Sequence, residues 1–398
     1  MKNKAGTFCT VFPNYRDYHF YKDPGQLPYR FASLGYNASI ICYQSDDALT
    51  ETRRHLDVVR VPGNAINRRI NSGIIMYLLF NAKRIDILNV FHYSWSSLLF
   101  AFIYKTVNKK GFVYLKFDHC AYARRGPDSN NSVRGYLPDM DCETLKGRIK
   151  NYFAGRFFVV KVDLWSVEDY LSREMLESEA DFLKGKLITV YNGQTSDLPG
   201  SLPACNPDMK EDIILTAGRL GTYQKATEVL MEAFKRVSFQ THFNLHLAGP
   251  IDPLFRDYLD KYIRENPSLG TRVIIHGPLG RDELYRLYCR SAIFCMPSRY
   301  EGMAIVFPEA MYYGNVIVTT ADTSLKPLVE DRRFGLVVKR ENTEALADAL
   351  LKLTGDRQLI REMAHNARMT ATDELSWDTI VKELHSEIEA RRADRELR

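Results

Sequence analysis

The chain has 398 residues, of which 45% are hydrophobic and 26% are charged, a balance that is typical of a soluble globular protein. This length predicts two domains, each long enough to build its own core. The formal net charge of +5 favours anionic partners such as nucleotides or lipid diphosphates, and it is too small to indicate nucleic acid binding by itself.

The cysteines and the N-terminal residues bear on the cellular compartment in which the protein is expected. The seven cysteines contain no Cys-x-x-Cys pair, which argues against a disulfide framework or a structural zinc site and favours reducing conditions. The N-terminal residues lack the apolar stretch of a signal peptide, and the longest apolar run, 74–80, is shorter than the ~20 residues of a membrane span. We therefore expect a cytoplasmic protein, with peripheral attachment to the inner face of a membrane left open.

Short apolar runs alternate with amphipathic stretches through the first half of the chain. The predicted strands are 7–12, 38–43, 86–91, 112–117, 164–167 and 187–191, with helical patterns such as 96–107 and 169–182 between them. The apolar runs do not alternate with polar residues, as is typical of buried parallel strands. Strands that alternate with helices predict a doubly wound α/β domain.

A segment rich in Gly, Pro, Ser, Asn and Asp, 192–208, reads as a linker, so we place a domain boundary near residue 205. A second doubly wound domain, 206–375, follows. Its predicted strands are 212–216, 243–248, 273–276, 293–296, 316–319 and 336–338. From Thr343 the chain is predicted to be helical, with helix starts at Thr343 and Ser376. Two such domains would face a cleft, and ligands bind beyond the carboxyl ends of parallel strands.

The first strand of the second domain leads into Gly218 and Arg219, and Lys225 precedes a helix. Glycine permits close backbone approach, and a helix N-terminus offers N–H groups to an anion. With two cations beside them, these groups suit a diphosphate that gains charge as it leaves. A tight turn with two solvated basic residues is the alternative.

A second motif runs from Cys295 to Glu309, where a strand is followed by a loop and a helix that begins near Val306. Glu301 in the loop can reach sugar hydroxyls. Glu309 in the first helical turn can accept hydrogen bonds from a ribose diol, because a carboxylate has two acceptor oxygens. The alternatives are a solvated loop residue and a complement to the helix dipole.

Together, Gly218-Arg219, Lys225 and Glu301-x7-Glu309 resemble the retaining glycosyltransferases of the GT4 family, which have the GT-B fold. The resemblance covers essentially the whole chain and is clearest over 213–376. It implies two Rossmann-like domains facing a cleft, with the C-terminal helix, 376–398, packing back on the N-terminal, acceptor-side domain, 1–205. It also implies a UDP- or GDP-type nucleotide sugar as donor, with no metal and no other cofactor.

By this resemblance, Arg219 and Lys225 grip the donor diphosphate, Glu301 contacts the transferred sugar and Glu309 holds the ribose. Ala226 departs from the family, which commonly has Gly there. The remaining positions expected to contact the donor by resemblance are Gly25, Gly218, Pro278, Leu279, Gly302, Met303 and Ala304.

The first domain carries weaker signals. Gly25 lies in a stretch that corresponds to the family's Gly-Gly loop, and the alternative is an ordinary turn. The strand 112–117 ends in Asp118 and His119, where similar enzymes touch the sugar or the acceptor, and a structural histidine is the alternative. Glu168 ends the strand 164–167 in the same way.

The segment 124–161 carries eight Lys or Arg against four Asp or Glu, and part of it is amphipathic. Such a helix either binds an anionic membrane or packs on its own domain.

The sequence thus predicts an enzyme that transfers a hexosyl-type sugar, with retention, to a glycan or lipid-linked acceptor in surface polysaccharide or glycolipid biosynthesis. A glycoside phosphorylase or hydrolase, or a non-catalytic protein of the same fold, is the alternative. A hydrolase would have no use for a nucleotide site.

Overall fold

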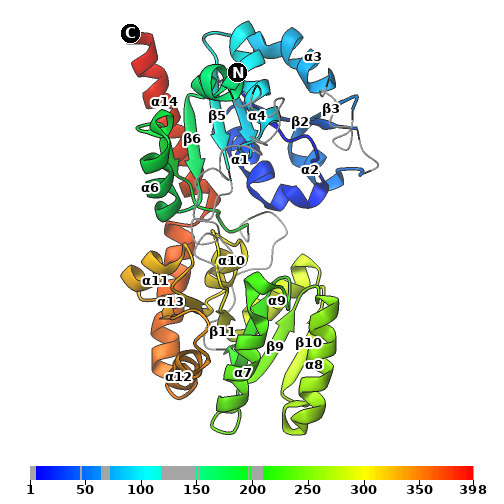
Figure 1. Ribbon diagram of the computed structural model, residues 1–398, viewed down its shortest axis with the longest axis vertical. Coiled ribbons are helices and arrows are strands. Elements are labelled where there is room, and N and C mark those ends of the chain that lie inside the picture. The colour runs from blue at the N-terminus through cyan, green and yellow to red at the C-terminus, as the bar shows by residue number, and fades with distance from the viewer. Residues whose placement is uncertain are drawn as a thin grey trace. The chain divides into compact units, whose positions relative to one another are not determined.

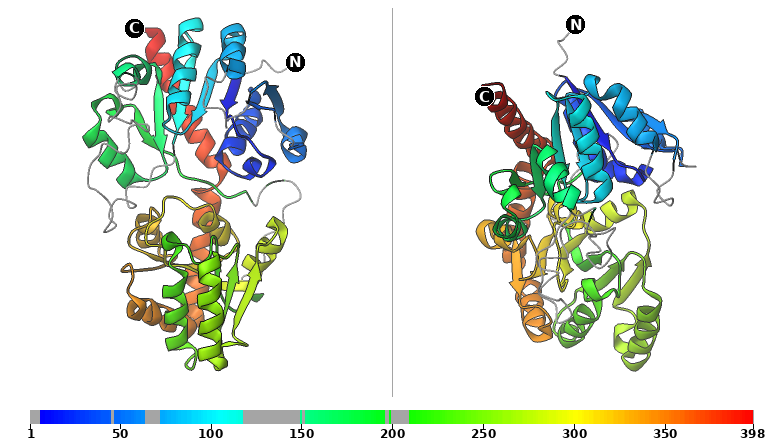
Figure 2. Two further views of the ribbon diagram at one scale, coloured as in Figure 1. Left: turned by 45° about the vertical axis from the view of Figure 1, so that its right-hand side comes forward. Right: turned by 45° about the horizontal axis from the view of Figure 1, so that its top comes forward.

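A computed structural model describes residues 6–44, 47–63, 72–117, 149, 152–195, 198 and 209–397 of the chain. These residues form two compact units, each built on one parallel sheet with helices packed against it (Figures 1 and 2). Among the described residues, the first unit runs to Tyr191 and resumes at Trp377, and the second holds the residues between them. The chain enters the second unit earlier than residue 205, because the amide of Gln194 donates to the carbonyl of Leu375 at 2.9 Å.

The first sheet has the strand order β3-β2-β1-β4-β5-β6-β7. Its strands are β1 (Thr7–Val11), β2 (Asn37–Tyr43), β3 (Asp57–Val61), β4 (Ile87–Phe91), β5 (Phe112–Lys116), β6 (Leu164–Val167) and β7 (Leu187–Thr189). All six strands predicted for this half are present. The structure adds β3, which lies at the edge of the sheet and pairs with β2.

The helices of the first unit are α1 (Asp23–Ser33), α2 (Thr50–His55), α3 (Ser72–Asn81), α4 (Trp95–Val107), α6 (Tyr170–Glu179) and α14 (Trp377–Leu397). Shorter helical segments are η1 (Asp17–Tyr21), η2 (Ala82–Arg84), η5 (Ala154–Phe158), η6 (Val159–Lys161) and η7 (Asp181–Leu183). Apolar side chains of α3, α4, η5 and η6 share one core with β1, β4, β5 and β6. This core lies on one face of the sheet, since it takes alternate residues of each strand.

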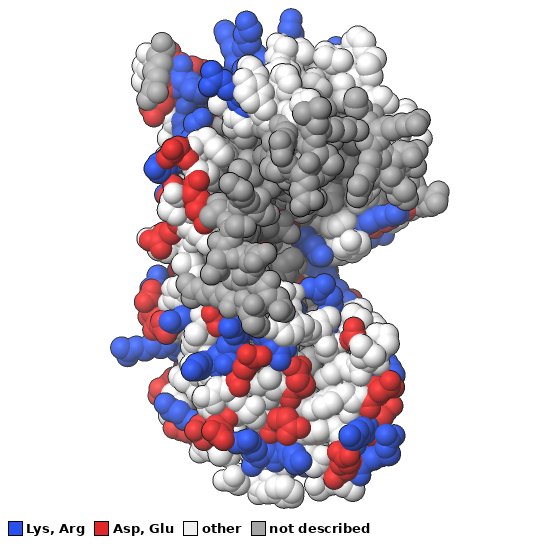
Figure 3. Space-filling model, viewed as in Figure 1, with Lys and Arg blue, Asp and Glu red and all other residues white. Residues whose placement is uncertain are grey.

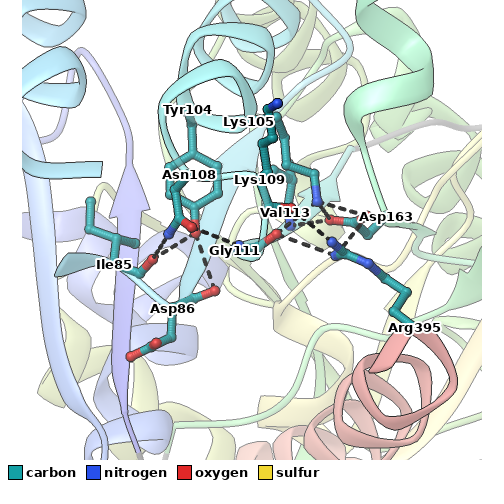
Figure 4. A network of polar contacts seen from close by, with 10 residues as sticks. All are labelled: Ile85, Asp86, Tyr104, Lys105, Asn108, Lys109, Gly111, Val113, Asp163 and Arg395. Carbon is teal, nitrogen blue, oxygen red and sulfur yellow. Dashed lines mark hydrogen bonds and ion pairs between the residues drawn. The ribbon is translucent and has the colours of Figure 1, made fainter. Parts of the chain in front are cut away.

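The C-terminal helix α14 packs against α1. Arg30 of α1 pairs with Asp378 at 3.0 Å. At the other end of α14, Arg395 donates to the carboxylate of Asp163 at 3.2 Å and to the carbonyl of Lys109 at 3.0 Å. Figure 4 shows Arg395 beside Gly111 in the turn between α4 and β5 and beside Asp163, which directly precedes β6 and also pairs with Lys105 of α4. Side-chain contacts therefore hold α14 to the first unit at both of its ends.

The second sheet has the strand order β10-β9-β8-β11-β12-β13. Its strands are β8 (Glu211–Ala217), β9 (Asn244–Ala248), β10 (Val273–Gly277), β11 (Ser291–Met296), β12 (Val316–Thr320) and β13 (Gly335–Val338), all of which were predicted. Its helices are η9 (Tyr223–Lys225), α7 (Thr227–Val237), α8 (Pro253–Glu265), η10 (Pro267–Leu269), α9 (Arg281–Arg290), α10 (Val306–Tyr312), α11 (Lys326–Arg332), α12 (Thr343–Thr354) and α13 (Arg357–Asp373). The prediction of two doubly wound α/β sheets is confirmed.

Candidate functional site

The strand order of the second sheet reverses between β8 and β11, which are hydrogen-bonded neighbours. In open parallel sheets, ligands bind beyond the carboxyl ends of the strands at such a reversal. The turn after β8 contains Gly218 and Arg219 and leads into η9, which ends at Lys225. The loop after β11 contains Glu301 and leads into α10, which contains Glu309. Both sequence motifs therefore lie at the edge where a ligand is expected.

Glycines bring the turns after β8 and β9 into direct contact. The amide of Gly218, whose φ is 153°, donates to the carbonyl of Ala248 at 3.0 Å. Gly249 has a φ of 128°, and a Cβ added to it would lie 2.0 Å from the carbonyl oxygen of Gly218. A side chain at position 249 would therefore push the Gly218 turn out of place.

Lys225 and Glu301 form an ion pair between Nζ and Oε2, and their side chains are only 12% and 10% exposed. The hydroxyl of Ser298 donates to the same carboxylate oxygen at 3.4 Å. Gln224 donates from Nε2 to the other oxygen at 3.3 Å. Both oxygens of Glu301 are thus engaged, and Lys225 balances its charge within a largely buried group.

Gln224 links this ion pair to Arg219. Its Oε1 accepts a hydrogen bond from the guanidinium of Arg219 at 2.9 Å, and its Nε2 also donates to the carbonyl of Tyr300 at 3.3 Å. Arg219 is exposed, and its partner in this contact is a neutral amide, so the contact leaves its charge uncompensated. The sequence interpretation missed Gln224, although its position next to Lys225 in η9 was a usable signal.

The loop that carries Glu301 is fixed through its backbone and through its neighbour Arg299. The amide of Glu301 donates to Asp322 and its carbonyl accepts from Ser324, both at 3.1 Å. Arg299 pairs with Glu228 of α7 at 2.6 Å. Because α7 follows directly after η9, this pair ties the Glu301 loop to the segment that carries Lys225.

Glu309 is 8% exposed and accepts hydrogen bonds from the hydroxyls of Tyr285 at 3.2 Å and Tyr288 at 3.5 Å. Burial raises the pKa of Glu309 to about 7, and the hydrogen bond from Tyr285 and the charge of Arg281 oppose this rise. The hydroxyl of Tyr285 also contacts that of Thr195 at 3.0 Å. Burial likewise raises the pKa of both tyrosines, so they remain hydrogen-bond donors near neutral pH. The sequence interpretation found the carboxylate and missed the tyrosines of α9.

Gly302, Met303 and Ala304 connect Glu301 to α10. Met303 is 1% exposed, and its carbonyl accepts a hydrogen bond from Nδ2 of Asn192 at 2.9 Å. The amide of Ala304 donates to the carbonyl of Gly302 at 3.2 Å, which closes a tight turn. The backbone between the two carboxylates is therefore compact and anchored to the start of the second unit.

Pro278 and Leu279 lie between β10 and α9, at the same edge of the sheet as the two motifs. β10 is the outermost strand and is separated from β8 by β9. These two residues therefore lie at the side of the candidate site, next to the start of the helix that presents Tyr285 and Tyr288.

In the first unit, Gly25 lies in the first turn of α1, which corrects the prediction of a loop. Its amide donates to the carbonyl of Lys22 at 3.0 Å. A Cβ on Gly25 would lie 2.3 Å from Cα of Phe20, so this glycine lets α1 pack closely on η1. Asp118 and His119 lie outside the described residues.

Lys116 is completely buried at the carboxyl end of β5. Its Nζ donates to the carbonyl of Val190 at 3.0 Å and lies 3.8 Å from Glu168 and 3.9 Å from Asp23. The structure thus brings Glu168, which the sequence singled out, together with a lysine and a second carboxylate at the ligand-binding edge of the first sheet.

Cys289 is disulfide-bonded, although the scattered cysteines argued against a disulfide framework. Cys9, Cys42 and Cys295 are free and buried. No group of three or more His, Cys, Asp and Glu within the described residues is arranged to hold a metal ion.

Comparison with known proteins gives a family match for the second unit. Residues 211–356 match the family described as glycosyl transferases group 1. An uncharacterized glycosyltransferase of Methanocaldococcus jannaschii is 31% identical over 175 residues, which are 44% of this chain and 43% of that protein. The chain therefore aligns with less than half of the length of this relative.

Solved structures match over nearly the whole chain. Sucrose-phosphate synthase from Thermosynechococcus elongatus is similar with a TM-score of 0.67 and 16% identity, covering 98% of this chain and 100% of that one. Anabaena HepE in complex with UDP-glucose is similar with a TM-score of 0.68 and 15% identity, covering 96% and 99%. The chain thus has the GT-B fold of glycosyltransferases, and its segment 211–356 has the sequence of the glycosyl transferases group 1.

Proposed function

We propose that the protein is a retaining glycosyltransferase that moves a hexosyl-type sugar from a UDP- or GDP-type nucleotide sugar. The observation that carries this proposal is the joining of Lys225 and Glu301 in one buried ion pair, next to the exposed Arg219, where the sheet order reverses. A site for a sugar diphosphate needs cations for the phosphates and hydroxyl acceptors for the sugar in one place. The similar solved structure of HepE is a complex with UDP-glucose, which supports a nucleotide sugar as the donor of this chain.

Arg219 and Lys225 stabilise the diphosphate as it leaves. Breaking the bond between sugar and phosphate adds negative charge to the leaving group, and cations held in advance lower the energy of that state. The side chain of Lys225 is 12% exposed, so little solvent screens its charge, and its attraction to a phosphate is stronger than the same attraction would be in water. Arg219 is exposed and can turn its guanidinium toward a phosphate in a bidentate contact.

Glu301 binds hydroxyls of the transferred sugar, and Glu309 binds the ribose. Both oxygens of Glu301 are engaged by Lys225, Ser298 and Gln224, which suits a fixed acceptor and not a nucleophile. The sequence offers no convincing covalent nucleophile. Retention therefore proceeds by attack of the acceptor on the same face of the sugar, assisted by the leaving phosphate.

The acceptor is a glycan or a lipid-linked glycan that binds mainly to the first unit, as in surface polysaccharide or glycolipid biosynthesis in the cytoplasm. Asp118 and His119 are proposed to contact the sugar or acceptor, and Gly25 to approach the donor phosphates. The basic segment 124–161, most of which lies outside the described residues, is proposed to touch an anionic membrane. Among the described residues, no helix is both long and apolar enough to cross a bilayer.

A screen of UDP- and GDP-sugars for binding and slow donor hydrolysis, with and without EDTA, tests this function. We expect one nucleotide to bind without added metal and to raise the melting temperature. Glu301→Ala is expected to abolish hydrolysis, and unchanged hydrolysis in this variant would disprove its role. Binding of sugar phosphates without any nucleotide would favour a phosphorylase, and binding without turnover would favour a non-catalytic protein.

A further inference from the structure

Lys210, which directly precedes β8, has an uncommon environment for a lysine. In Figure 3, Lys and Arg side chains on the second unit lie among Asp and Glu side chains, and Arg236 pairs with Glu344 in this way at 3.0 Å. Lys210 is partly buried instead, and none of the described carboxylates forms an ion pair with it. Burial, with a smaller contribution from the charge of Arg368, lowers the pKa of Lys210 to about 7. The amine is therefore held by something other than an opposite charge.

The amine of Lys210 joins the ends of two helices. Its Nζ donates to the carbonyl of Tyr288 in the last turn of α9 at 2.8 Å, and to the carbonyl of Tyr313, which directly follows α10, at 2.6 Å. Carbonyls at the C-terminal end of a helix lack partners within the helix and attract a cation. Asn315 adds a second link, because its Nδ2 donates to the carbonyls of Tyr288 and Ala310, both at 2.9 Å. Lys210 and Asn315 thus hold the last turns of α9 and α10 together.

These two helices also carry the group that contains Glu309. The hydroxyl of Tyr288 in α9 donates to Oε2 of Glu309 in α10 at 3.5 Å. The rings of Tyr288 and Tyr313 stack, with centroids 6.2 Å apart and an angle of 16° between their planes. All three side chains are buried, so the close packing around them leaves little room for adjustment. Lys210 therefore holds the main chain of both tyrosines, and Tyr288 in turn contacts the carboxylate.

We propose that Lys210 is a positioning residue for nucleotide binding, which sets the place of the Tyr288 hydroxyl against the carboxylate of Glu309. The inference rests on the proposed function, because it takes Glu309 to bind the ribose. Lys210 acts through Tyr288 and not by contact with the nucleotide. A hydrogen bond of 3.5 Å is long, so a small movement of α9 against α10 would break it.

The pKa of Glu309 in the ligand-free protein tests the inference without any nucleotide. Isotope labelling of the glutamate carboxyl carbons allows NMR to follow ionisation, and the signal that is missing in Glu309→Gln identifies this residue. Burial raises the pKa of Glu309, and the hydrogen bond from Tyr288 is one of the contacts that oppose the rise. Tyr288→Phe should therefore raise this pKa further, by about half a pH unit or more.

Lys210→Met keeps an apolar side chain of similar length and removes the donor. It should raise the pKa of Glu309 in the same direction as Tyr288→Phe. When Tyr288 is already Phe, Lys210→Met should cause no further rise, because the two changes act through one hydrogen bond. A direct effect of the lysine charge on Glu309 would instead persist in the double variant.

The matched control is Arg272→Met, in the same unit. Arg272 also donates to backbone carbonyls, to that of Thr241 at 2.9 Å and to those of Ser238 and Phe243. In the described part of the chain, none of its hydrogen bonds reaches α9 or α10. This variant should lose stability and leave the pKa of Glu309 unchanged.

An unchanged pKa of Glu309 in Lys210→Met would overturn the proposal. An equal rise in Arg272→Met, or a further rise in the Tyr288→Phe background, would overturn it as well. If Lys210→Met does not fold, Asn315→Ala breaks the same link between α9 and α10 and should give the same rise.

Isothermal titration with UDP-glucose and GDP-glucose separates this inference from the proposed function. Lys210→Met should bind the nucleotide sugar that the wild type binds about tenfold more weakly at pH 7, a loss of roughly one hydrogen bond. Lys210→Arg keeps N–H donors and should restore most of the affinity. Unchanged affinity in Lys210→Met would overturn the inference. A wild type that binds no nucleotide sugar would contradict the proposed function, and the pKa of Glu309 would still decide whether Lys210 positions Tyr288.

Discussion

The buried carboxyl group of Glu309 makes nucleotide binding depend on pH. Burial raises its pKa from 4.5 to about 7, because Tyr285 and Tyr288 only partly replace the lost solvation. Ribose hydroxyls donate to the ionised form, so binding is stronger where that form is populated. With this pKa, about one-tenth of the carboxyl is ionised at pH 6 and about nine-tenths at pH 8. We predict that the affinity for a UDP- or GDP-sugar rises by about tenfold between these values.

Isothermal titration at pH 6, 7 and 8 measures this change. A nucleotide sugar is the appropriate ligand, because its diphosphate is esterified at both ends and lacks the phosphate ionisation near pH 6. Glu309→Gln stays neutral and serves as the control, with weaker binding that does not vary with pH. A flat affinity profile in the wild-type protein, or the same rise in Glu309→Gln, would refute the assignment of Glu309 to the ribose.

The raised pKa of Glu309 also makes the free energy of unfolding depend on pH. The folded-state pKa is above the unfolded value, so the folded state holds the proton more tightly between pH 4.5 and about 7. The stability that Glu309 contributes is therefore fully present below pH 4.5 and is lost as the pH rises through 7. At 1.36 kcal/mol for each unit of pKa, the loss is about 3 kcal/mol. Glu309→Gln should consequently gain stability relative to the wild type between pH 5 and pH 8.

Two predictions concern stability at fixed pH. Gly249→Ala should cost about 3 kcal/mol in urea unfolding, because its φ is 128° and the new Cβ would lie 2.0 Å from the carbonyl of Gly218. Gly277 has a φ of 68°, and a Cβ added to it would have no heavy atom within 4 Å, so Gly277→Ala should cost only about 1 kcal/mol of unfolding free energy. Equal losses of stability in the two variants would contradict the packing argument. Asp163→Asn should cost about 2 kcal/mol and speed hydrogen exchange near Arg395 in α14, because the carboxylate is 15% exposed. Unchanged exchange there would show that this contact does not hold the helix (Figure 4).

The strands were predictable because their side chains are buried on both faces and the runs are continuously apolar. β9 and β11 are examples, since nearly every residue in them is buried. β3 was missed because it is an edge strand that begins with exposed Asp57 and has only half-buried residues before Val61. Gly25 was assigned to a loop because its stretch corresponds to the family's Gly-Gly loop, whereas the structure places it in α1, where it lets the helix approach η1.

The sequence was sufficient to predict the charged residues of the candidate site. Arg219, Lys225, Glu301 and Glu309 follow strand ends, and the topology brings those ends to one edge. The groups that hold these residues were not predictable, since they come from distant segments. Tyr285 and Tyr288 fit the amphipathic pattern of α9, and nothing in the sequence shows that they face Glu309.

The central claim is that Lys225 stabilises a departing diphosphate, and single-turnover cleavage of the donor tests it most directly. Lys225→Ala removes a cation that is 12% exposed and paired with Glu301, so cleavage of the bound nucleotide sugar should slow by about 100-fold or more. Lys261→Ala, which removes a lysine that is 68% exposed in the same unit, should cleave the donor at the wild-type rate. Wild-type cleavage by Lys225→Ala at saturating donor would contradict the account.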